Sequence, residues 1–240
     1  MSFNQVFTKI VKDKRPIMTI IGGHDQGKTN FALYLFEKAY KLGLVKELGT
    51  NIRTVDDERV VEVTSYPFLK RWLRSSNAMK WFTLDEAGLH VYRRNPLSKK
   101  TKSIVGISFL IRKFHAKMIF IAQRSRDIEG TFLDPAFNVC KFKKITREYA
   151  EFLSPHVEGV GEIYPIPSCT IKFDTWDSAP FTMDARADEV IKGRALCCQV
   201  ARLFLEHGTY SGVAHELGDK TLINHPMKVK RLLIEHLKHG

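Results

Sequence analysis

The chain has 240 residues, of which 44% are hydrophobic, and its 38 lysines and arginines outnumber 26 acidic residues, giving a net charge of +12. This length and apolar content suit one large α/β domain with a small appendage. No apolar stretch approaches the roughly 18 residues of a membrane span, and the first residues lack the apolar core of a signal peptide. Because its four cysteines form no C-x-x-C pair, we expect reduced thiols in an intracellular protein and no zinc site.

Strand-like and helix-like segments alternate along the first 145 residues. Residues 1–15 read as a polar, basic lead-in, and residues 44–58 as a polar loop. We expect strands at 16–21, 59–65, 79–84, 117–122 and 137–145. We expect helices at 28–42, 67–74 and 101–114. This alternation predicts an α/β fold with a right-handed, doubly wound, mostly parallel sheet.

The composition changes after residue 154. Four prolines punctuate residues 154–184, with one strand expected at 169–175, so this stretch reads as the end of the core and a connector. Helical patterning returns at 185–207 and 226–238. We therefore expect one domain over residues 1–184 and a helical module over residues 185–240.

A phosphate-binding loop is the most specific motif. Residues 22–29 read G-G-H-D-Q-G-K-T, which fits G-x-x-x-x-G-K-[ST] between an apolar strand and a helical segment. Glycines at both ends would let the intervening amides form an anion nest at a helix N-terminus. Lys28 would reach the β- and γ-phosphates, and Thr29 would ligate Mg²⁺. The alternative is an ordinary glycine turn. The expected nucleotide-binding residues are Gly22, Gly23, His24, Asp25, Gln26, Gly27, Lys28, Thr29 and Asn30.

Polar residues end the two other strands that would flank this loop. Asp85 and Glu86 follow the 79–84 strand, where Asp85 would hold the Mg²⁺ shell and Glu86 would act as general base toward water. Gln123 closes the 117–122 strand and could sense the γ-phosphate. A pair of solvated carboxylates and an amide that caps a loop are the simpler readings.

These motifs together carry a family resemblance. Asp85-Glu86-Ala87, then R-K-F-H at 112–115 and I-A-Q-R at 121–124, resemble the ATPase core of the FtsK–HerA superfamily over about residues 16–145. That group includes DNA-pumping motors of bacteria and archaea and packaging ATPases of archaeal and membrane-containing viruses. The resemblance implies a RecA-like P-loop fold of the ASCE type, with the Gln123 strand between the Lys28 and Asp85 strands. It also implies rings, usually hexamers, with ATP between subunits.

A ring motor needs a cation from the neighbouring subunit to stabilise the transferring phosphoryl group. In the DNA-pumping members an arginine precedes the glutamine strand, and Arg112 matches that position. Arg124, directly after the glutamine, is the second candidate, and Arg93 and Arg94 are weaker ones. Each could instead contact DNA or be a plain surface charge. The chain lacks a large pore-forming insertion, which favours a compact viral or plasmid-borne version.

Basic residues are concentrated beside this site. Residues 87–126 contain no acidic residue and ten basic ones, which suggests a polyanionic partner, most plausibly nucleic acid. We expect double-stranded DNA to contact a basic loop over residues 93–102. Its candidate DNA-binding residues are Arg93, Arg94, Lys99, Lys100 and Lys102.

The last 56 residues suggest a further DNA contact. Residues 211–218 resemble the first helix and turn of a helix-turn-helix, and Lys228, Lys230 and Arg231 lie on polar positions of the last helix. Because residues 219–225 exceed a tight turn, a winged-helix-like module and a helical lid both remain open.

The function that these features favour is an ATP-hydrolysing, DNA-stimulated translocase acting as a ring, either a viral genome-packaging motor or a plasmid DNA pump. It would act in the host cytoplasm, with virion association and contact to a capsid or portal-site protein as further expectations. One alternative is an ATP-controlled, sequence-specific DNA-binding initiator or regulator. Another is a phage-assembly-type morphogenesis ATPase, which would need a membrane partner.

Overall fold

The computed structural model describes residues 3–55, 57–90, 99–154, 159–174, 181–183 and 209. Residue contacts divide the chain into two units, Met1–Asp184 and Ala185–Gly240, and all described residues except Thr209 belong to the first. The expected helix-turn-helix, with Lys228, Lys230 and Arg231, lies outside the described residues.

The described helices and strands alternate along the first 144 residues. The helices are α1 (Phe3–Lys12), α2 (Lys28–Lys41), α3 (Tyr66–Arg74), α4 (Ala87–His90) and α5 (Lys99–Leu110). The strands are β1 (Ile17–Ile21), β2 (Glu47–Thr50), β3 (Val60–Glu62), β4 (Lys80–Leu84), β5 (Ala116–Ala122), β6 (Asn138–Lys144), β7 (Ala150–Ser154) and β8 (Gly159–Ile163). Short 3₁₀ turns are η1 (Ile111–Phe114), η2 (Ser125–Asp127) and η3 (Gly130–Phe132).

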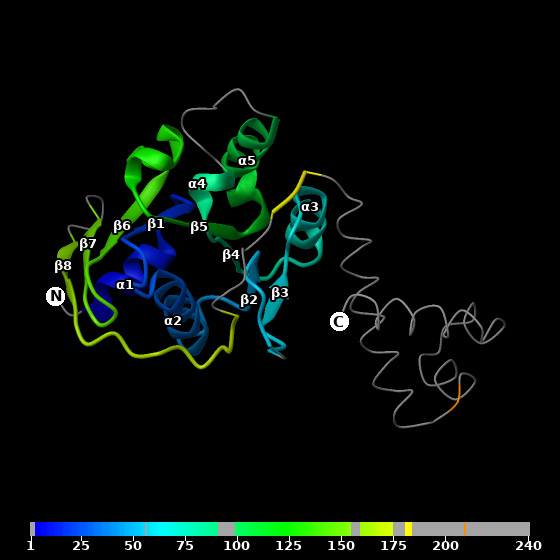
Figure 1. Cartoon of the computed structure of the whole chain (residues 1–240). Helices are drawn as coiled ribbons and strands as arrows, with labels where there is room; N and C mark the ends of the chain where they lie inside the picture. The colour runs from blue at the N-terminus through cyan, green and yellow to red at the C-terminus, as the bar shows by residue number, and fades with distance from the viewer. Residues whose placement is uncertain are drawn as a thin grey trace. The chain divides into compact units, whose positions relative to one another are not determined.

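One eight-stranded sheet organises the described residues, in the order β3-β2-β4-β5-β1-β6-β7-β8 (Figure 1). The strands from β3 to β6 in this order are parallel, and β7 and β8 extend the sheet antiparallel. The expected mostly parallel α/β sheet is confirmed. β5 lies between β1 and β4, as the family resemblance implied, and the fold is the RecA-like P-loop fold.

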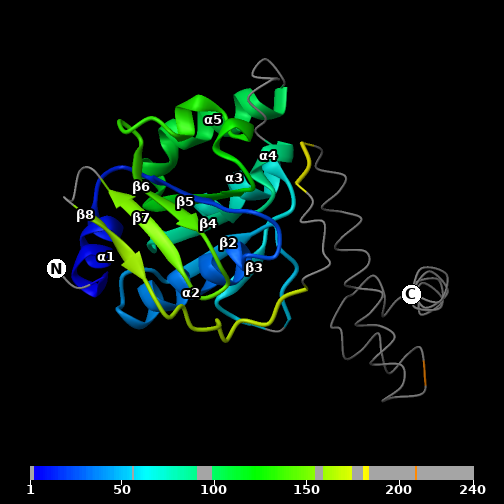
Figure 2. The same ribbon diagram turned by 60° about the vertical axis from the view of Figure 1, so that its left-hand side comes forward.

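Helices cover both faces of the sheet (Figure 2). Apolar side chains of α1 and α2 pack with one set of alternating strand residues, including Met18 and Ile20. Side chains of α3 and α5 pack with the opposite set, including Ile17 and Met118. Because successive strand residues point to opposite faces, a parallel sheet buried on both sides reads as continuous apolar runs.

Two segments that we expected to be irregular form regular elements. The predicted lead-in contains helix α1, which buries Val6, Phe7, Ile10 and Val11. Their spacing places the four side chains on one helical stripe, and packing outweighs the polar residues between them. The predicted 44–58 loop contains strand β2, whose Gly49 lies so close to Trp72 that a Cβ would come within 2.8 Å of the indole ring.

The end of the core also differs from expectation. Strands β7 and β8 form an antiparallel extension that we did not predict. The strand expected at 169–175 is wrong over its described residues, where only an isolated bridge joins Phe173 to Thr54. This segment instead satisfies its amides through side chains of α2.

The segment 164–174 crosses α2. Glu37, 3% exposed on α2, accepts hydrogen bonds from the backbone amides of Thr170, at 2.9 and 3.0 Å, and of Ile171, at 3.1 Å. It also accepts the Thr170 hydroxyl. Asn30 lies on the same face of α2, about two turns nearer its start. It accepts from Cys169 N at 2.9 Å and donates to Pro167 O at 3.4 Å. Two polar residues of α2 thus hold the segment in place.

Part of the expected basic loop over residues 93–102 is helical. The helix begins at Lys99, so Lys99, Lys100 and Lys102 belong to its first turn and not to a loop. Arg93 and Arg94 lie outside the described residues. Lys117, one of the ten basic residues of the 87–126 segment, cannot contact DNA in this fold. It is 2% exposed and donates to the backbone oxygens of Asp13 and Arg15.

Candidate active site

Functional side chains gather where the parallel strands end. Asn51 follows β2, Asp85 and Glu86 follow β4, Gln123 follows β5, and the glycine loop follows β1. The parallel pairing of these strands puts all their carboxyl ends at one edge of the sheet. In open α/β sheets, this edge is where ligands bind.

The loop needs glycine at two positions for different reasons. A Cβ at Gly22 would come 2.8 Å from the Lys144 Cβ and 2.9 Å from its carbonyl oxygen, so β6 leaves no room for a side chain. Gly27 has φ +70°, in the left-handed region, and stands at the N-cap of α2. Glycine reaches this conformation without steric cost and lets the chain turn directly from loop to helix.

Two hydrogen bonds shape the interior of the loop. Gln26 Oε1 accepts from Gly23 N at 2.5 Å, and Lys28 Nζ donates to Gly23 O at 2.7 Å. Gln26 was expected only as one of the nucleotide-binding positions of the loop, and the structure shows its side chain bridging across the loop to Gly23. The ammonium of Lys28 therefore lies inside the curve of the loop, where a bound phosphate would receive its charge.

The loop also offers backbone donors. The first hydrogen bond into α2 runs from Phe31 N to Gly27 O at 3.0 Å. The amides of Lys28, Thr29 and Asn30 precede it and have no acceptor within the helix. Such amides at a helix N-terminus favour an anion. The role of Asn30 as a nucleotide contact stays a prediction, since its side chain bonds to the 164–174 segment.

Thr29 and Asp85 meet across the site. Thr29 Oγ1 donates to Asp85 Oδ2 at 2.6 Å, which joins the first turn of α2 to the end of β4. A hydroxyl and a carboxylate oxygen at this separation are hard oxygen ligands suited to Mg²⁺. The structure brings these two residues together on the side of the loop that faces β4, and their role as Mg²⁺ ligands stays a prediction.

Asn51 positions Asp85, and sequence reasoning missed it. Asn51 Oδ1 accepts from Asp85 N at 2.8 Å, and its Nδ2 donates to Asp85 O at 3.2 Å. The side chain is buried, with 1% exposure. A polar residue directly after a strand in the β2 position was the available signal, but we had read that strand as a loop.

The Asp85 carboxyl group sits in a desolvated place. Burial raises its pKa, while hydrogen bonds from the Thr29 hydroxyl and the Glu86 amide act in the opposite direction. A carboxylate whose charge is poorly hydrated gains most when a cation arrives.

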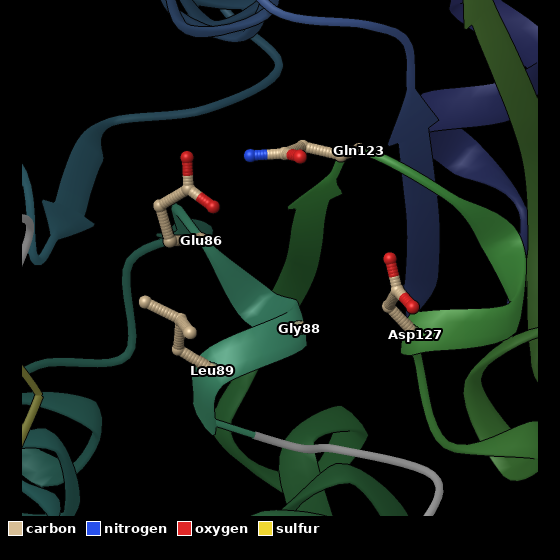
Figure 3. A pocket seen from close by; sticks show the side chains of 5 residues that line it. All are labelled: Glu86, Gly88, Leu89, Gln123 and Asp127. Atoms are coloured by element: carbon tan, nitrogen blue, oxygen red, sulfur yellow. The ribbon is translucent and has the colours of Figure 1, made fainter.

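Glu86 and Gln123 line a shared cavity of about 350 Å³ with Gly88, Leu89 and Asp127. Figure 3 shows the side chains of Glu86 and Gln123 pointing toward each other from the ends of their strands. Glu86 has φ 48°, a left-handed turn immediately after Asp85. This arrangement places a candidate base and a candidate sensor around one space.

Asp127 was not among the residues expected at the site. It stands in η2 beyond Gln123 and borders the same cavity. A Cβ at Gly88 would lie 3.2 Å from the Asp127 Cβ, so α4 and η2 approach closely there. The sequence signal was weak, because a lone aspartate in a turn-rich stretch is common.

The two leading candidate arginines lie at opposite ends of the central strand β5. Arg124 is exposed directly after Gln123, at the carboxyl end of the strand, where the phosphate loop lies. Arg112 is exposed in η1, before β5 begins, and so lies at the amino end. Arg112 is remote from the phosphate loop of its own chain and could act only on another copy.

The turn between β6 and β7 supplies two more cations near the loop. Lys144 closes β6, is 2% exposed, and donates through Nζ to Arg147 O at 2.9 Å. Arg147 Nε donates to Asp25 O in the phosphate loop at 3.1 Å. Neither residue was expected at the site, because no sequence motif links that turn to the loop.

A glycine loop after β1, a lysine inside it, and a Thr–Asp pair shared with the next carboxylate strand define a P-loop ATPase site on a RecA-like sheet. No family model and no curated protein matches the chain in sequence.

Several solved structures resemble the chain in fold. The genome-packaging NTPase B204 of Sulfolobus turreted icosahedral virus 2, in complex with ATP-gammaS, aligns with TM-score 0.48 and 10% identity over 65% of this chain and 100% of that one. The N-terminal domain of zonular occludens toxin from Neisseria meningitidis aligns with TM-score 0.47 and 14% identity over 64% and 95%. ATPases 2 and 3 of EssC from Geobacillus thermodenitrificans align with TM-score 0.42 and 11% identity over 64% and 37%.

With TM-scores below 0.5 and identities of 10–14%, these likenesses carry no argument about the activity of this chain, and the chemistry of the site is inferred from its own geometry. Within the part of the chain that the structure describes, no helix is long and apolar enough to cross a membrane.

Proposed function

We propose that the chain is an ATP-hydrolysing DNA translocase that acts as a ring, of the kind that packages a viral genome or pumps a plasmid. The observation that carries the ATPase assignment is the 2.6 Å contact between Thr29 and Asp85, with Lys28 in the adjoining loop. An ordinary glycine turn would give no reason for a helix-start hydroxyl to meet a carboxylate 56 residues away. The DNA and ring assignments rest on charge and on the motif resemblance.

The residues divide the reaction between them. The loop amides and Lys28 bind the β- and γ-phosphates. Thr29 and Asp85 would hold Mg²⁺, which would supply charge neutralisation to the bound phosphates. Glu86 accepts a proton from a water molecule in the cavity as the water oxygen attacks the γ-phosphorus, and ADP leaves. Gln123 faces the same space and reports the presence of the γ-phosphate to β5.

ATP turnover tests this assignment. The wild-type chain is expected to hydrolyse ATP with Mg²⁺, and Lys28→Ala and Glu86→Gln each abolish turnover. Glu86→Gln keeps nucleotide binding, because it removes the base and leaves the loop intact. Absence of Mg²⁺-dependent ATP binding by the wild type would end the proposal, and loss of binding in Glu86→Gln would remove Glu86 as base.

The motor assignment is tested separately, with duplex DNA and a mass measurement. A motor gives ATPase stimulation by any duplex sequence, with strong salt dependence, from an assembly several times the mass of one chain. A tight footprint on one sequence without such stimulation would indicate the DNA-binding regulator instead. Arg112→Ala is expected to abolish turnover in the assembly, because the arginine would serve a neighbouring site.

The first turn of α5 is the proposed DNA contact. Replacing Lys99, Lys100 and Lys102 by alanine is expected to reduce DNA stimulation and spare basal turnover. The matched control replaces exposed lysines on the other face of the sheet: Lys9, Lys41 and Lys46. Equal losses in both triple variants would mean that net charge, and not this turn, attracts DNA.

We further propose that the motor works inside a host cell with a capsid or portal-site partner, on the basis of the motif resemblance to viral packaging ATPases. Co-sedimentation with empty capsids of the cognate virus tests that partner, and binding that persists in Lys28→Ala would show that docking precedes ATP turnover.

A further inference from the structure

The β6–β7 turn approaches the phosphate loop from the side opposite the catalytic cavity. In the sheet order, β1 separates β5 from β6. Glu86 and Gln123 follow β4 and β5 on one side, whereas Arg147 follows β6 on the other. A triphosphate held by the loop therefore has its γ end toward β4 and β5 and its α end toward β6.

Arg147 is tied to the loop by its geometry. Its Nε donates to Asp25 O at 3.1 Å, and its Cα lies 3.8 Å from the position of a Cβ at Gly27. A Cβ at Gly27 would therefore make ordinary van der Waals contact with the turn. The arginine backbone is thus packed against the same residue that starts helix α2.

Lys144, at the end of β6, holds the β6–β7 turn through a hydrogen bond to its backbone. The lysine is 2% exposed, and its Nζ donates to Arg147 O at 2.9 Å. On its other side its Cβ and carbonyl oxygen abut Gly22. Both ends of the phosphate loop therefore touch the β6 end and its turn, so the position of Arg147 relative to the loop is built into the fold.

The guanidinium of Arg147 has donors that form no hydrogen bond with the described residues. The hydrogen bond to Asp25 uses Nε alone, and no described residue accepts from its two terminal nitrogens. The side chain is exposed and carries a permanent charge. A planar guanidinium held beside an anion nest suits two hydrogen bonds to one phosphate group.

We propose that Arg147 binds the α- or β-phosphate of the nucleotide in its own chain. Arg147 is thus a binding residue and not a trans-acting catalytic arginine. It contacts phosphates that ATP and ADP share and that change little in the transition state. Its loss therefore weakens ATP and ADP equally and leaves turnover at saturation intact. This inference rests on the proposed ATPase function.

The test compares Arg147→Gln with Lys143→Ala. Lys143 is an exposed cation on the same strand end that pairs with Glu151 at 3.5 Å, so its variant removes one charge without touching the loop. We expect Arg147→Gln to raise the Kd for both ATP and ADP about tenfold, equivalent to about 1.4 kcal/mol. Lys143→Ala leaves both values within about twofold.

Three further readouts separate phosphate binding from a structural tie. Turnover at saturating ATP stays within about twofold of wild type in Arg147→Gln, as loss of uniform binding requires. Arg147→Lys restores part of the affinity, because charge without the planar fork suffices for part of it. The salt dependence of the ADP Kd becomes shallower when the cation is lost.

Clear results would overturn the inference. Unchanged affinity in Arg147→Gln, equal losses in the Lys143 control, or a fall in turnover at constant affinity would each do so. A wild-type chain that binds no nucleotide defeats the ATPase proposal itself. A wild type that binds and hydrolyses ATP beside an unaffected Arg147→Gln defeats this inference alone.

Discussion

Replacing Asn51 by alanine should damage both the fold and the metal site. In the native structure the Asn51 amide accepts from Asp85 N at 2.8 Å and donates to Asp85 O at 3.2 Å, at a position with 1% exposure. Alanine leaves a buried amide and a buried carbonyl without these partners. Each orphaned group costs about 1–3 kcal/mol, so we expect a loss of about 3 kcal/mol in the free energy of unfolding.

The second effect concerns Mg²⁺. Asp85 carries the carboxylate that meets Thr29, and Asn51 fixes the backbone from which that carboxylate extends. Loss of a partner that orients a metal ligand weakens metal affinity by about 10- to 100-fold. We therefore expect Asn51→Ala to raise the Mg²⁺ concentration needed for tight ATP binding by at least about tenfold.

The assay combines urea unfolding with Mg²⁺ titration of a fluorescent ATP analogue. Ser154→Ala serves as control, because Ser154 is fully buried and its hydroxyl donates to Val139 O at 2.6 Å. This hydrogen bond lies away from the candidate site. That variant loses about 1 kcal/mol and keeps its Mg²⁺ dependence. If Asn51→Ala loses less than about 1 kcal/mol, or matches the control in Mg²⁺ titration, the positioning role is wrong.

Three other substitutions test further features of the structure. Gly22→Ala forces a Cβ to within 2.8 Å of the Lys144 Cβ, so it lowers the free energy of unfolding by about 1–3 kcal/mol and weakens ATP binding. Gly106→Ala, the control, adds a methyl group in open space on α5, so it leaves ATP binding intact and leaves stability unchanged or improved. Burial raises the pKa of Asp85, so protons compete with Mg²⁺ for its carboxylate. Mg²⁺ affinity should therefore fall on acidification at a higher pH than for an ordinary carboxylate. Asp85→Asn abolishes this pH dependence, and an identical pH profile in both proteins would contradict the assignment. Burial lowers the pKa of Lys117 from 10.5 to about 8. Between these pH values the unfolded chain binds one proton more than the folded chain, so stability rises with pH, by at most about 3 kcal/mol from this residue. Urea unfolding at pH 8 and 10 should show a smaller rise in Lys117→Met, and an equal rise would show that Lys117 is not its source.

The centre of the fold was predictable because its signals are local. The apolar runs that became β1, β4 and β5 are buried on both faces, and such runs have few alternatives in an α/β chain. The short strand β2 escaped because its sequence, Glu-Leu-Gly-Thr, has little strand propensity, and its place is fixed by β4 and by packing of Trp72 on Gly49.

The candidate site was predictable where a motif carries it. The spacing of Lys28, Thr29 and Asp85 followed from the loop pattern and from the expected order of strands. Asn51 and Arg147 were not foreseeable in this way, because their partners are backbone atoms from distant segments. A backbone carbonyl leaves no trace in the sequence, so a side chain that serves one cannot be recognised by pairing residue types.

The attachment of segment 164–174 to α2 has a consequence for the order in which the protein is made. Glu37 leaves the ribosome well over a hundred residues before Thr170 and Ile171, whose amides donate hydrogen bonds to its carboxylate. Until those amides arrive, burial of its carboxylate is opposed by the loss of hydration. The helix that begins at the phosphate loop thus completes its surroundings late in translation, and a nascent chain that stops before residue 170 holds that helix without its polar anchor.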